Sequence, residues 1–589
     1  MNPLYKVENL KKIDVDKLIS FSKEIRNDMI EIVSKTGGHI GVNMGISDIT
    51  LCLHYVFDFP NDDLIFDVGH NVYTHKMLTD RLKGLKTMRQ HNGMSGFHNP
   101  SESKYDLVNG SHAGTSLSTG LGVAISKRYS NDETITISVI GDASIVEGSS
   151  AEALNHIATE KVRMLIVIND NNIAIDDWNG GIKEMLSSNP KNYFESMGFD
   201  YYGPQNGHNI KGMVDLFQNL KSIDRPTILH LKTIKGYGLP WPDDNAWKYH
   251  WSFPYNKEDG SITSGNDYWN QPKGKFINSV ASQAIREILK KDKNAMIISP
   301  ATNGISGLVD IFNDYPDQTV DVAMAEQHAV AFACALPLKS NIKPILCFQS
   351  AFLPRAYDQL IQELCLNNSP VLILDTRSGL GGLDHEVHHS LMDISYLSPL
   401  PNLKIKFPSG VTSLKNTIID SYENLDGPTI ILYAYGTIPD LVSNDEEIKL
   451  NNKLNKLKDC NLALLTIGNT EKLGYELQRY LWEEKHIASL VENIVDISPL
   501  NEESLMNVCN NYKYLISLEE NMLRGGFGSA IAEFVCDNSL NNKLHRVGFQ
   551  NEFVAKGLRS FIYPKYGLDI DSIVKAINDK WDLKGLSCK

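Results

Sequence analysis

A carboxylate and an amide follow two apolar segments in a spacing that suits a metal–phosphate site. Asp142 stands directly after the apolar run TITISVIG (134–141), and Asn171 follows the next such run, MLIVIN (164–169). A carboxylate, an amide oxygen and a backbone carbonyl can form part of the octahedral oxygen shell of Mg²⁺, which diphosphate oxygens and water complete. The sequence therefore predicts Asp142 and Asn171 as ligands of a magnesium ion.

The elements around these residues would have to bring them to one place. Asp142 lies between an expected strand and the helical pattern AEALNHIATEK (151–161). One strand–helix–strand unit delivers both residues to the same edge of a parallel sheet, where ligands collect. The small residues Ala143 and Ser144 let backbone N–H groups approach a phosphate. A Gly-Asp turn alone also ends many strands that bind nothing, so the weight rests on the combined arrangement.

Apolar runs of strand length alternate with helix-type stretches through three blocks of the chain. Strands that are apolar along their whole length and separated by helices are typical of parallel sheets covered on both faces. We therefore predict an α/β fold with three domains, each a mostly parallel sheet covered by helices. Two polar stretches without periodicity, 238–275 and 437–458, are candidate linkers. They give expected domains at 1–255, 275–437 and 458–589.

Composition narrows the class of protein. Hydrophobic residues make up 42% and charged residues 22% of the chain, as in ordinary globular proteins. A net charge of −14 does not favour nucleic acid or an anionic membrane as partner. The longest apolar runs are too short to cross a bilayer, and the start has no apolar core of signal-peptide length. Eight scattered cysteines without a C-x-x-C pair suit reduced thiols. We expect a cytoplasmic protein that acts on small molecules.

The strand–Gly-Asp-Ala–helix–strand–Asn-Asp-Asn-Asn arrangement resembles the thiamine-diphosphate motif, which usually reads Gly-Asp-Gly. Longer segments resemble the 1-deoxy-D-xylulose-5-phosphate synthases and, more distantly, the transketolases. These segments are SKTGGHIGVNMGISDITLCLHYVFDFPNDDLIFDVGHNVYTHKMLTDR (34–81), NGSHAGTSLSTGLGVA (109–124), AEQHAVAFA (325–333) and FLPRAYDQL (352–360).

The resemblance covers almost the whole chain and implies a domain order. A diphosphate-binding domain would come first, a pyrimidine-binding domain second and a transketolase-type C-terminal domain last. It also implies thiamine diphosphate and Mg²⁺ as cofactors, a homodimer, and a place in isoprenoid or thiamine biosynthesis.

Glu326 is the candidate for the second half of a thiamine site. The pyrimidine N1′ of that cofactor needs a carboxylic acid partner, whose proton promotes loss of the proton at C2. The run TVDVAMAEQ (319–327) offers Glu326 at its polar end. The alternative is an ordinary glutamate at a helix N-terminus, which the helix dipole favours. Because the same chain carries a diphosphate motif, we favour the catalytic role.

The resemblance assigns further residues to the site. It implies metal ligation by Asp142, Asn171 and the carbonyl of Ile173. The residues implied to line the cofactor are His70, Ser111, His112, Ala113, Ala143, Ser144, Asn171, Glu326 and Phe352. Those implied to face the reacting carbonyl groups are His39, His250, Asp384 and His388.

Imidazoles suit this chemistry because they exchange protons near neutral pH. A lone histidine is nevertheless more often structural, and we place His75, His98, His156 and His389 in that class. Arg355 is implied to bind the acceptor's phosphate, for which a planar guanidinium is well shaped. Its alternative is a surface helix residue paired with Asp358.

The acceptor end departs from the family pattern. Tyr435 stands where a Tyr-Pro-Arg-Gly segment normally provides a second phosphate-binding arginine, and Gln349 replaces an aromatic residue. His385 and Glu386 stand where the family has smaller, uncharged residues, and NIVDISPL (493–500) lacks an Arg and a Lys. The sequence therefore predicts an intact cofactor half and an altered site for the acceptor's phosphate.

Three functions follow as hypotheses. The first is condensation of a decarboxylated 2-oxo acid, pyruvate, with an aldehyde such as glyceraldehyde 3-phosphate to give a 1-deoxy-ketose, or with a different, unphosphorylated acceptor. The second is a transketolase-type ketol transfer between sugars, which the segment KGYGLPWPDDNAWKYH (235–250) resembles equally. The third is a non-catalytic paralogue, against which the presence of Asp142, Asn171 and Glu326 argues.

Overall fold

The computed structural model describes residues 2–90, 92–175, 177–241, 250–263, 274–457 and 460–581. It divides into two compact units, Met1–Gln271 with Asp321–Ala325, and Pro272–Val320 with Glu326–Lys589. Much of the expected linker 238–275, namely 242–249 and 264–273, lies outside the described residues.

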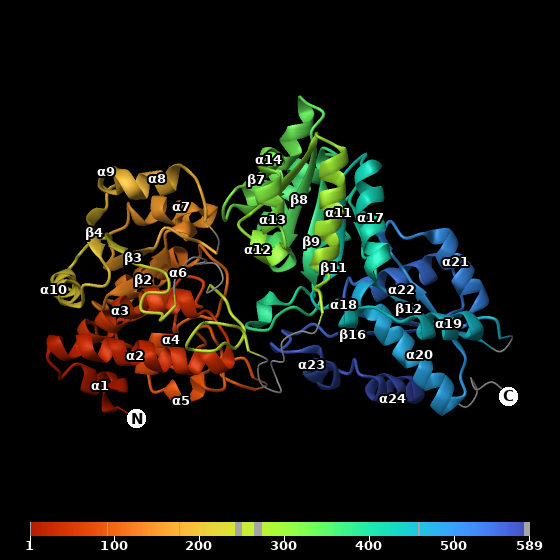
Figure 1. The fold of residues 1–589 in the computed structure, drawn as a ribbon, viewed down its shortest axis with the longest axis horizontal. Coiled ribbons are helices and arrows are strands. Elements are labelled where there is room, and N and C mark those ends of the chain that lie inside the picture. Colours follow the sequence, from red (N-terminus) through yellow and green to blue (C-terminus); the bar gives the residue numbers. More distant parts are fainter. Residues whose placement is uncertain are drawn as a thin grey trace. The chain divides into compact units, whose positions relative to one another are not determined.

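The first unit is built on a five-stranded sheet of order β1-β2-β3-β5-β4 in which the paired strands are parallel (Figure 1). Alternate residues of β3 face opposite sides. Leu165 and Val167 join one hydrophobic core, and Ile166 and Ile168 join another. This period of two explains why the strand is apolar along its whole length. The strands are β1 Asp63–Phe66, β2 Thr136–Gly141, β3 Met164–Asp170, β4 Asp200–Asn206 and β5 Thr227–Lys232.

Helices cover both faces of this sheet. The helices α2, α3 and α10 pack in one core with β2, β3 and β5, whereas α6, α7 and α9 pack in the other. The helices of this unit are α1 Val7–Leu10, α2 Val15–Thr36, α3 Ile40–Val56, α4 Tyr73–Leu78, α5 Leu82–Leu85, α6 Ser116–Ser130, α7 Gly148–Ile157, α8 Gly181–Ser188, α9 Pro190–Met197 and α10 Ile210–Leu220, with a 3₁₀ turn η2 Ala143–Val146.

The second unit holds two sheets. The larger has the order β14-β10-β11-β9-β8-β6-β7, and its β10–β14 pair is antiparallel whereas β10–β11, β11–β9, β9–β8 and β8–β6 are parallel. The smaller, β13-β12-β15-β16, is parallel throughout (Figure 1). Their strands are β6 Ala295–Ser299, β7 Thr319–Asp321, β8 Lys343–Gln349, β9 Leu372–Ser378, β10 Lys404–Lys406, β11 Thr429–Ala434, β12 Leu462–Thr466, β13 Ser489–Asn493, β14 Asp496–Ser498, β15 Tyr514–Met522 and β16 Lys543–Phe549.

The helices of the second unit follow the same α/β alternation. They are α11 Asn278–Lys291, α12 Asn303–Ser306, α13 Val309–Asp314, α14 Glu326–Ala335, α15 Tyr357–Gln359, α16 Asp393–Leu397, α17 Val411–Glu423, α18 Ile438–Leu441, α19 Asp445–Leu454, α20 Glu471–Lys485, α21 Glu502–Asn511, α22 Phe527–Asp537, α23 Arg559–Tyr566 and α24 Ile570–Lys580. A 3₁₀ segment, η6 Ser350–Ala356, a π-helical segment, η7 Leu360–Leu366, and a 3₁₀ turn, η8 Glu386–His388, also belong to this unit.

The predicted α/β class is confirmed, with mostly parallel sheets covered by helices. The strand expected at 319–327 is shorter than predicted, because β7 ends at Asp321 and Ala323 adopts a left-handed backbone. Glu326 therefore begins α14 and does not end a strand. The polar stretch 437–458 contains α18 and α19, and a capping box at Asn444 begins α19.

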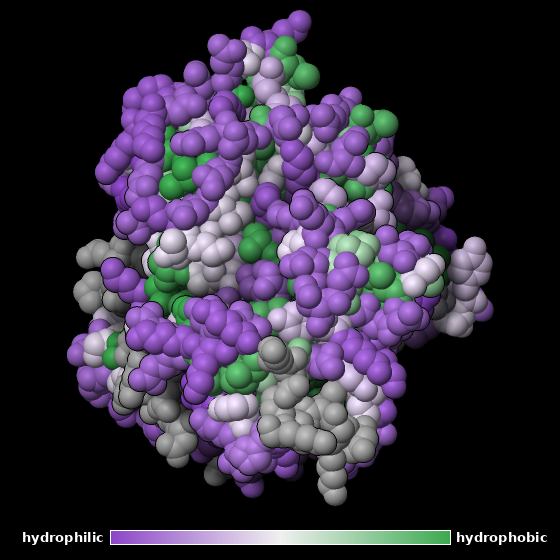
Figure 2. Space-filling model, turned by 90° about the vertical axis from the view of Figure 1, so that its right-hand side faces the viewer, coloured by the Kyte–Doolittle hydropathy of each residue, from purple (hydrophilic) through white to green (hydrophobic). Residues whose placement is uncertain are grey.

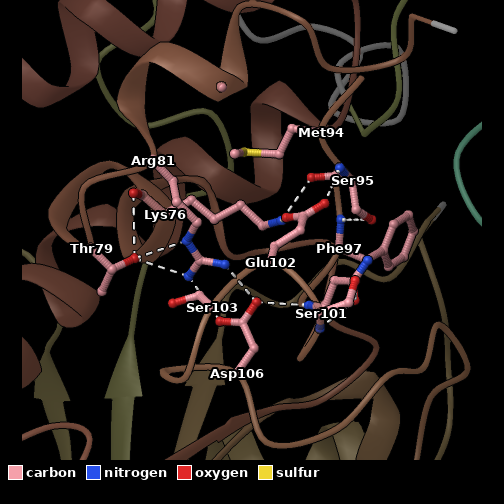
Figure 3. Close-up of polar contacts among 12 residues, drawn as sticks. Lys76, Thr79, Arg81, Met94, Ser95, Phe97, Ser101, Glu102, Ser103 and Asp106 are labelled. Carbon is pink, nitrogen blue, oxygen red and sulfur yellow. Dashed lines mark hydrogen bonds and ion pairs between the residues drawn. The ribbon is translucent and has the colours of Figure 1, made fainter. Parts of the chain in front are cut away.

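A buried network of charges in the first unit joins residues 75–81 to Glu102 and Asp106 (Figure 3). Arg81 donates to both carboxylate oxygens of Asp106, at 2.7 and 2.8 Å. His75 contacts the same carboxylate at 2.9 Å, and its other ring nitrogen contacts His54. Lys76 donates to Glu102 at 2.6 Å. Each of these charges is compensated where it is buried, as the interior requires.

The surface and the helices agree with the globular composition of the chain. Figure 2 shows one face on which hydrophilic side chains predominate and hydrophobic ones lie in small separate groups. No helix in the described part of the chain has the length and apolar character to cross a membrane.

Candidate active site

Two neighbouring strands of the first unit end side by side at the predicted metal site. Gly141, the last residue of β2, is the register partner of Asn169 in β3. Asp142 follows Gly141 directly, and Asn171 lies just beyond the end of β3. The structure therefore brings Asp142 and Asn171 to one edge of the sheet. Ala143 and Ser144 begin the turn η2, one turn ahead of α7.

Asp142 is a buried carboxyl group whose charge is not fully compensated. Its side chain is 3% exposed, and its Oδ2 atom has no hydrogen-bond partner among the described residues. Burial, together with the nearby carboxylate of Asp170, raises the pKa of Asp142 to about 7. A divalent cation would supply the missing positive charge and the missing partner, so the residues present fit Mg²⁺.

Asp170 shows the opposite environment at the same edge. His230 Nε2 lies 2.7 Å from its carboxylate, and Lys232 also donates to it. Burial alone would raise the pKa of Asp170, but these two partners outweigh burial and lower it. Asn171 is held in a tight turn, in which its Oδ1 accepts the backbone N–H of Ile173 at 3.1 Å. Of the two aspartates, Asp142 is therefore the one open to a metal ion.

A loop at the end of β1 places the predicted cofactor residues Ser111, His112 and Ala113. Asp67 fixes it, because its carboxylate accepts the backbone N–H groups of Gly114, Thr115 and Ser116 at 3.0–3.1 Å. Gly114 has a φ of +82°, and a side chain there would collide with Glu147. Ser111 is 4% exposed, and its hydroxyl has no hydrogen-bond partner within the described part of the chain.

Three of the predicted histidines form a cluster in the first unit. The ring centroids of His39 and His70 are 4.9 Å apart, and His250 lies 5.5 Å from His39 and 5.4 Å from His70. His39 precedes α3, at its N-cap position, and is 8% exposed. Asn43 fixes the neighbouring backbone by donating to the carbonyls of His39 and His70, each at 2.8 Å.

The environment of His250 favours a neutral imidazole. Burial, followed by the positive charge of Lys235, lowers the pKa of His250 well below its usual value. The Nδ1 atom of His250 has no hydrogen-bond partner among the residues described. Lys235 is itself 3% exposed and donates to the carbonyl of Ala174 at 2.7 Å. Sequence reasoning missed Lys235; its position shortly after the end of β5 was the available signal.

Glu326 lies at the start of α14 in the second unit. It is 5% exposed, and Arg355 Nε lies 3.4 Å from its Oε2 atom. Burial raises the pKa of Glu326, and the charge of Arg355 only partly opposes this. A carboxyl group whose pKa is raised holds its proton more readily and can donate it to a ring nitrogen. The structure thus places Arg355 beside Glu326, while its role at the acceptor's phosphate stays a prediction.

The remaining predicted residues lie on loops of the same unit. Phe352, in η6, has its ring centroid 6.4 Å from that of His388, at the end of η8. Asp384 is 9% exposed, and its charge partly offsets the effect of burial on the pKa of His385, which is lowered to about 4. Both rings of the pair His385–His388 lie 5.9 Å apart.

Arg377 is a residue that sequence reasoning did not assign. It lies next to the last position of β9 with a φ of +69°, and its guanidinium carbon is 4.4 Å from the ring centroid of Tyr435. The polar strand end Asp375-Thr376-Arg377 was the available signal. The sequence predicts that Tyr435 replaces an arginine, and in the structure its ring lies over a second arginine, Arg377.

Matches to known families agree with this arrangement. The model described as 1-deoxy-D-xylulose-5-phosphate synthase matches residues 1–192 and 183–233. The transketolase pyrimidine-binding domain matches residues 277–438, and the transketolase C-terminal domain matches 454–573. Together they define a transketolase-type, thiamine-diphosphate-dependent transferase.

Relatives of the same length narrow the class. The 1-deoxy-D-xylulose-5-phosphate synthase of Halothermothrix orenii is 33% identical over 98% of this chain and 97% of its own. Those of Caldanaerobacter subterraneus and Azobacteroides pseudotrichonymphae are 32% and 31% identical over 97% of this chain and 98% and 97% of theirs. The chain belongs to the 1-deoxy-D-xylulose-5-phosphate synthase family.

Among solved structures, a transketolase from Leishmania mexicana is 15% identical over 96% of this chain and 97% of its own, with a TM-score of 0.42. The family assignment depends on the sequence matches.

Proposed function

We propose that this enzyme condenses the two-carbon unit of decarboxylated pyruvate with an aldehyde to give a 1-deoxy-ketose. The observation that carries the proposal is the buried, uncompensated carboxyl group of Asp142 at the edge that also bears Asn171. That arrangement suits a metal–diphosphate group, and the relatives named above are 1-deoxy-D-xylulose-5-phosphate synthases.

Thiamine diphosphate and Mg²⁺ are the cofactors we propose. Asp142, Asn171 and the carbonyl of Ile173 would hold the metal, and Ala143, Ser144, Ser111, His112 and Ala113 would line the cofactor. When bound, thiamine diphosphate supplies the carbon nucleophile and the electron sink that decarboxylation needs. The protein supplies charge compensation at Asp142 and a hydroxyl at Ser111 that has no other partner in the described structure.

Proton transfer is the task we propose for Glu326 and the histidines. Because burial raises the pKa of Glu326, its carboxyl group would hold a proton more readily and could donate it to a pyrimidine nitrogen of the cofactor. His39, His70 and His250 lie within 5.5 Å of one another, ring to ring. Imidazoles there can donate to a carbonyl oxygen on which negative charge develops, and the imidazole of His388 can do so on the second unit, which also carries Asp384.

Because Tyr435 stands where the family has a second phosphate-binding arginine, we expect this enzyme to prefer phosphorylated aldehydes less strongly. Tyr435 provides no charge at its position, and its ring lies over the guanidinium of Arg377. Loss of one charged contact to a phosphate corresponds to about 1.5–3 kcal/mol. We therefore propose that unphosphorylated aldehydes compete with glyceraldehyde 3-phosphate in this enzyme.

Product analysis tests the proposal. The purified enzyme with thiamine diphosphate and Mg²⁺ would receive ¹³C-labelled pyruvate and a panel of phosphorylated and free aldehydes, with mass spectrometry of the products. We expect labelled CO₂ and a labelled 1-deoxy-ketose, and neither with the Glu326→Gln variant. Ketol transfer between sugars without CO₂ release would favour the transketolase-type reaction instead.

We also propose the three functional domains 1–255, 275–437 and 458–589, a cytoplasmic location and a homodimer. No disulfide joins the seven described cysteines, as a reducing compartment allows. Large apolar side chains are exposed on the second unit, with Leu338 72%, Leu366 78% and Ile361 41% exposed. Such exposure suits a protein interface. Sedimentation analysis of the parent and of Leu366→Asp tests the dimer.

A further inference from the structure

One buried carboxylate of the C-terminal domain contacts the loop that carries Asp384 and His388. Glu520, in β15, is fully buried, and its Oε2 atom accepts the backbone N–H of Leu380 at 3.0 Å. Asn469 also donates to it, and the hydroxyl of Tyr563 donates to Oε1 at 2.6 Å. Leu380 begins the loop that carries Asp384 and His388, so Glu520 fixes that loop from the neighbouring domain of the same unit.

Arg559, the first residue of α23, connects Glu520 to Tyr435. Its Nε and Nη2 atoms donate to the two carboxylate oxygens of Glu520, the second at 2.9 Å. Its Nη1 atom donates to the backbone carbonyl of Tyr435 at 2.8 Å. A guanidinium can make these contacts at once because its donors lie in a rigid fork, which a lysine lacks.

Tyr435 is therefore held between two arginines. Arg559 holds its carbonyl oxygen, and its ring lies 4.4 Å from the guanidinium carbon of Arg377. The ring of Phe276 packs against Tyr435 from a centroid distance of 5.6 Å. The ring of Tyr435 covers one face of the guanidinium of the half-buried Arg377 and so limits the directions from which an anion can approach it.

We propose that Arg559 is a positioning residue that sets acceptor preference: it holds Tyr435 over Arg377 and so withholds that guanidinium from an anionic acceptor. This inference rests on the proposed function. It assigns the C-terminal domain a part in substrate choice, through a main-chain contact and with no direct contact to the substrate. Release of Tyr435 would expose Arg377 and favour an aldehyde that carries a phosphate.

The test compares kcat/KM for glyceraldehyde 3-phosphate and for glyceraldehyde. Arg559→Lys keeps a cation beside Glu520, which protects the fold, but one ammonium group cannot also hold the carbonyl of Tyr435. We expect the ratio of phosphorylated to free aldehyde to rise about three- to tenfold, through KM for the phosphorylated aldehyde. Lys565→Ala, an exposed change in the same helix, is the control and leaves the ratio unchanged.

A double-mutant cycle separates this role from a merely structural one. Tyr435→Ala removes the ring and should raise the ratio by itself, and adding Arg559→Lys should then change nothing further. An unchanged ratio in Tyr435→Ala, or an effect of Arg559→Lys that persists without the ring, would overturn the inference. A parent enzyme that makes 1-deoxy-ketose but fails this cycle refutes the inference alone. A parent that makes no such product from either aldehyde refutes the proposed function as well.

Discussion

The strand edge at Asp142 and the loops around Tyr435 differ in how far their buried polar atoms are hydrogen-bonded. In the first region, Asp142 Oδ2, Ser111 Oγ and His250 Nδ1 are buried without a hydrogen-bond partner in the described structure. All three belong to the first unit, and two of them lie on loops at the carboxyl ends of its parallel strands.

In the second region, the charged side chains that hold the loops satisfy one another, although Asn469 Oδ1 and Ser390 Oγ are buried without a partner among the described residues. His389 accepts the backbone N–H of Gly382 at 2.8 Å and donates to the carbonyl of Ala555 at 3.0 Å. Glu520 accepts donors from both domains of the second unit, and Arg559 occupies the carbonyl of Tyr435. These bonds stabilise the loops, and they leave fewer groups for a substrate.

This difference indicates which of the two regions is built to bind a ligand with its polar atoms. A buried polar atom without a partner costs about 1–3 kcal/mol, so it persists where a ligand supplies the partner. A satisfied network adds stability and fixes shape. Under the proposed function, the edge at Asp142 would hold the cofactor, whereas the loops around Tyr435 would offer the acceptor a preformed surface. The predictions below test this contrast.

The largest effect is expected for Glu326→Gln. The amide cannot donate a carboxylic acid proton, so turnover should fall by about 10²–10⁴-fold while folding and cofactor binding stay close to those of the parent. Steady-state rates and exchange of the cofactor's C2 proton measure this. Glu423→Gln, an exposed change at the end of α17, is the matched control. Exchange at the parent rate in Glu326→Gln would contradict the role.

Asp106→Asn should destabilise the first unit without affecting cofactor affinity. Asp106 is a buried carboxylate that Arg81 (Figure 3) and His75 satisfy, and removal of its charge leaves the cation of Arg81 uncompensated. Breaking a buried ion pair costs about 3–5 kcal/mol. A thermal melt should show an earlier transition, while calorimetric titration gives the parent's affinity for thiamine diphosphate.

Low pH should remove the stabilising contribution of the Asp106 carboxylate from the parent protein. Burial alone would raise the pKa of Asp106, but the bonds from His75 and Arg81 outweigh burial and hold the pKa well below its usual range. A carboxyl group with a lowered folded-state pKa stabilises the fold above its unfolded-state pKa, near 4, and less as the pH falls below it. Melting temperatures below pH 5 should therefore fall more steeply in the parent than in Asp106→Asn. Parallel curves would contradict this assignment.

Asp142→Ala and Asn171→Ala should give the reverse pattern in the same unit. Loss of a charged ligand should weaken binding of Mg²⁺ and thiamine diphosphate together, by about one to two decades for Asp142. The cofactor-free protein should melt no earlier for Asp142→Ala, because the removed charge had no full compensation. Calorimetric titration with and without Mg²⁺ measures this. Unchanged affinity in both variants would mean that the metal site lies elsewhere.

The smallest effect is expected at the acceptor end. Tyr435→Arg should move preference toward glyceraldehyde 3-phosphate by roughly one decade, and Arg355→Ala should move it away. Competition assays that report kcat/KM for each aldehyde decide the matter. A parent that already prefers the phosphorylated aldehyde by several decades, with no response in Tyr435→Arg, would show that other groups hold the phosphate.

The sequence by itself determined the α/β class and the edge that carries the candidate metal site. Uninterrupted apolar runs predict parallel strands, and β2 and β3 lie where those runs lie. Because successive parallel strands end at the same edge, the spacing of Asp142 and Asn171 was enough to bring them together. Local pattern and short-range connection fix such features.

Only the tertiary structure decided which distant residues meet. The family resemblance assigned His39 and His250 to one site, but no spacing in the chain brings their rings to 5.5 Å or joins Arg559 to the carbonyl of Tyr435. The same holds for Asp142 and Asp170, two similar aspartates at one edge of the sheet. His230 compensates one of them, while the other stays without compensation. Burial and partners from other strands set the state of each carboxyl group, and neither is written in the local sequence.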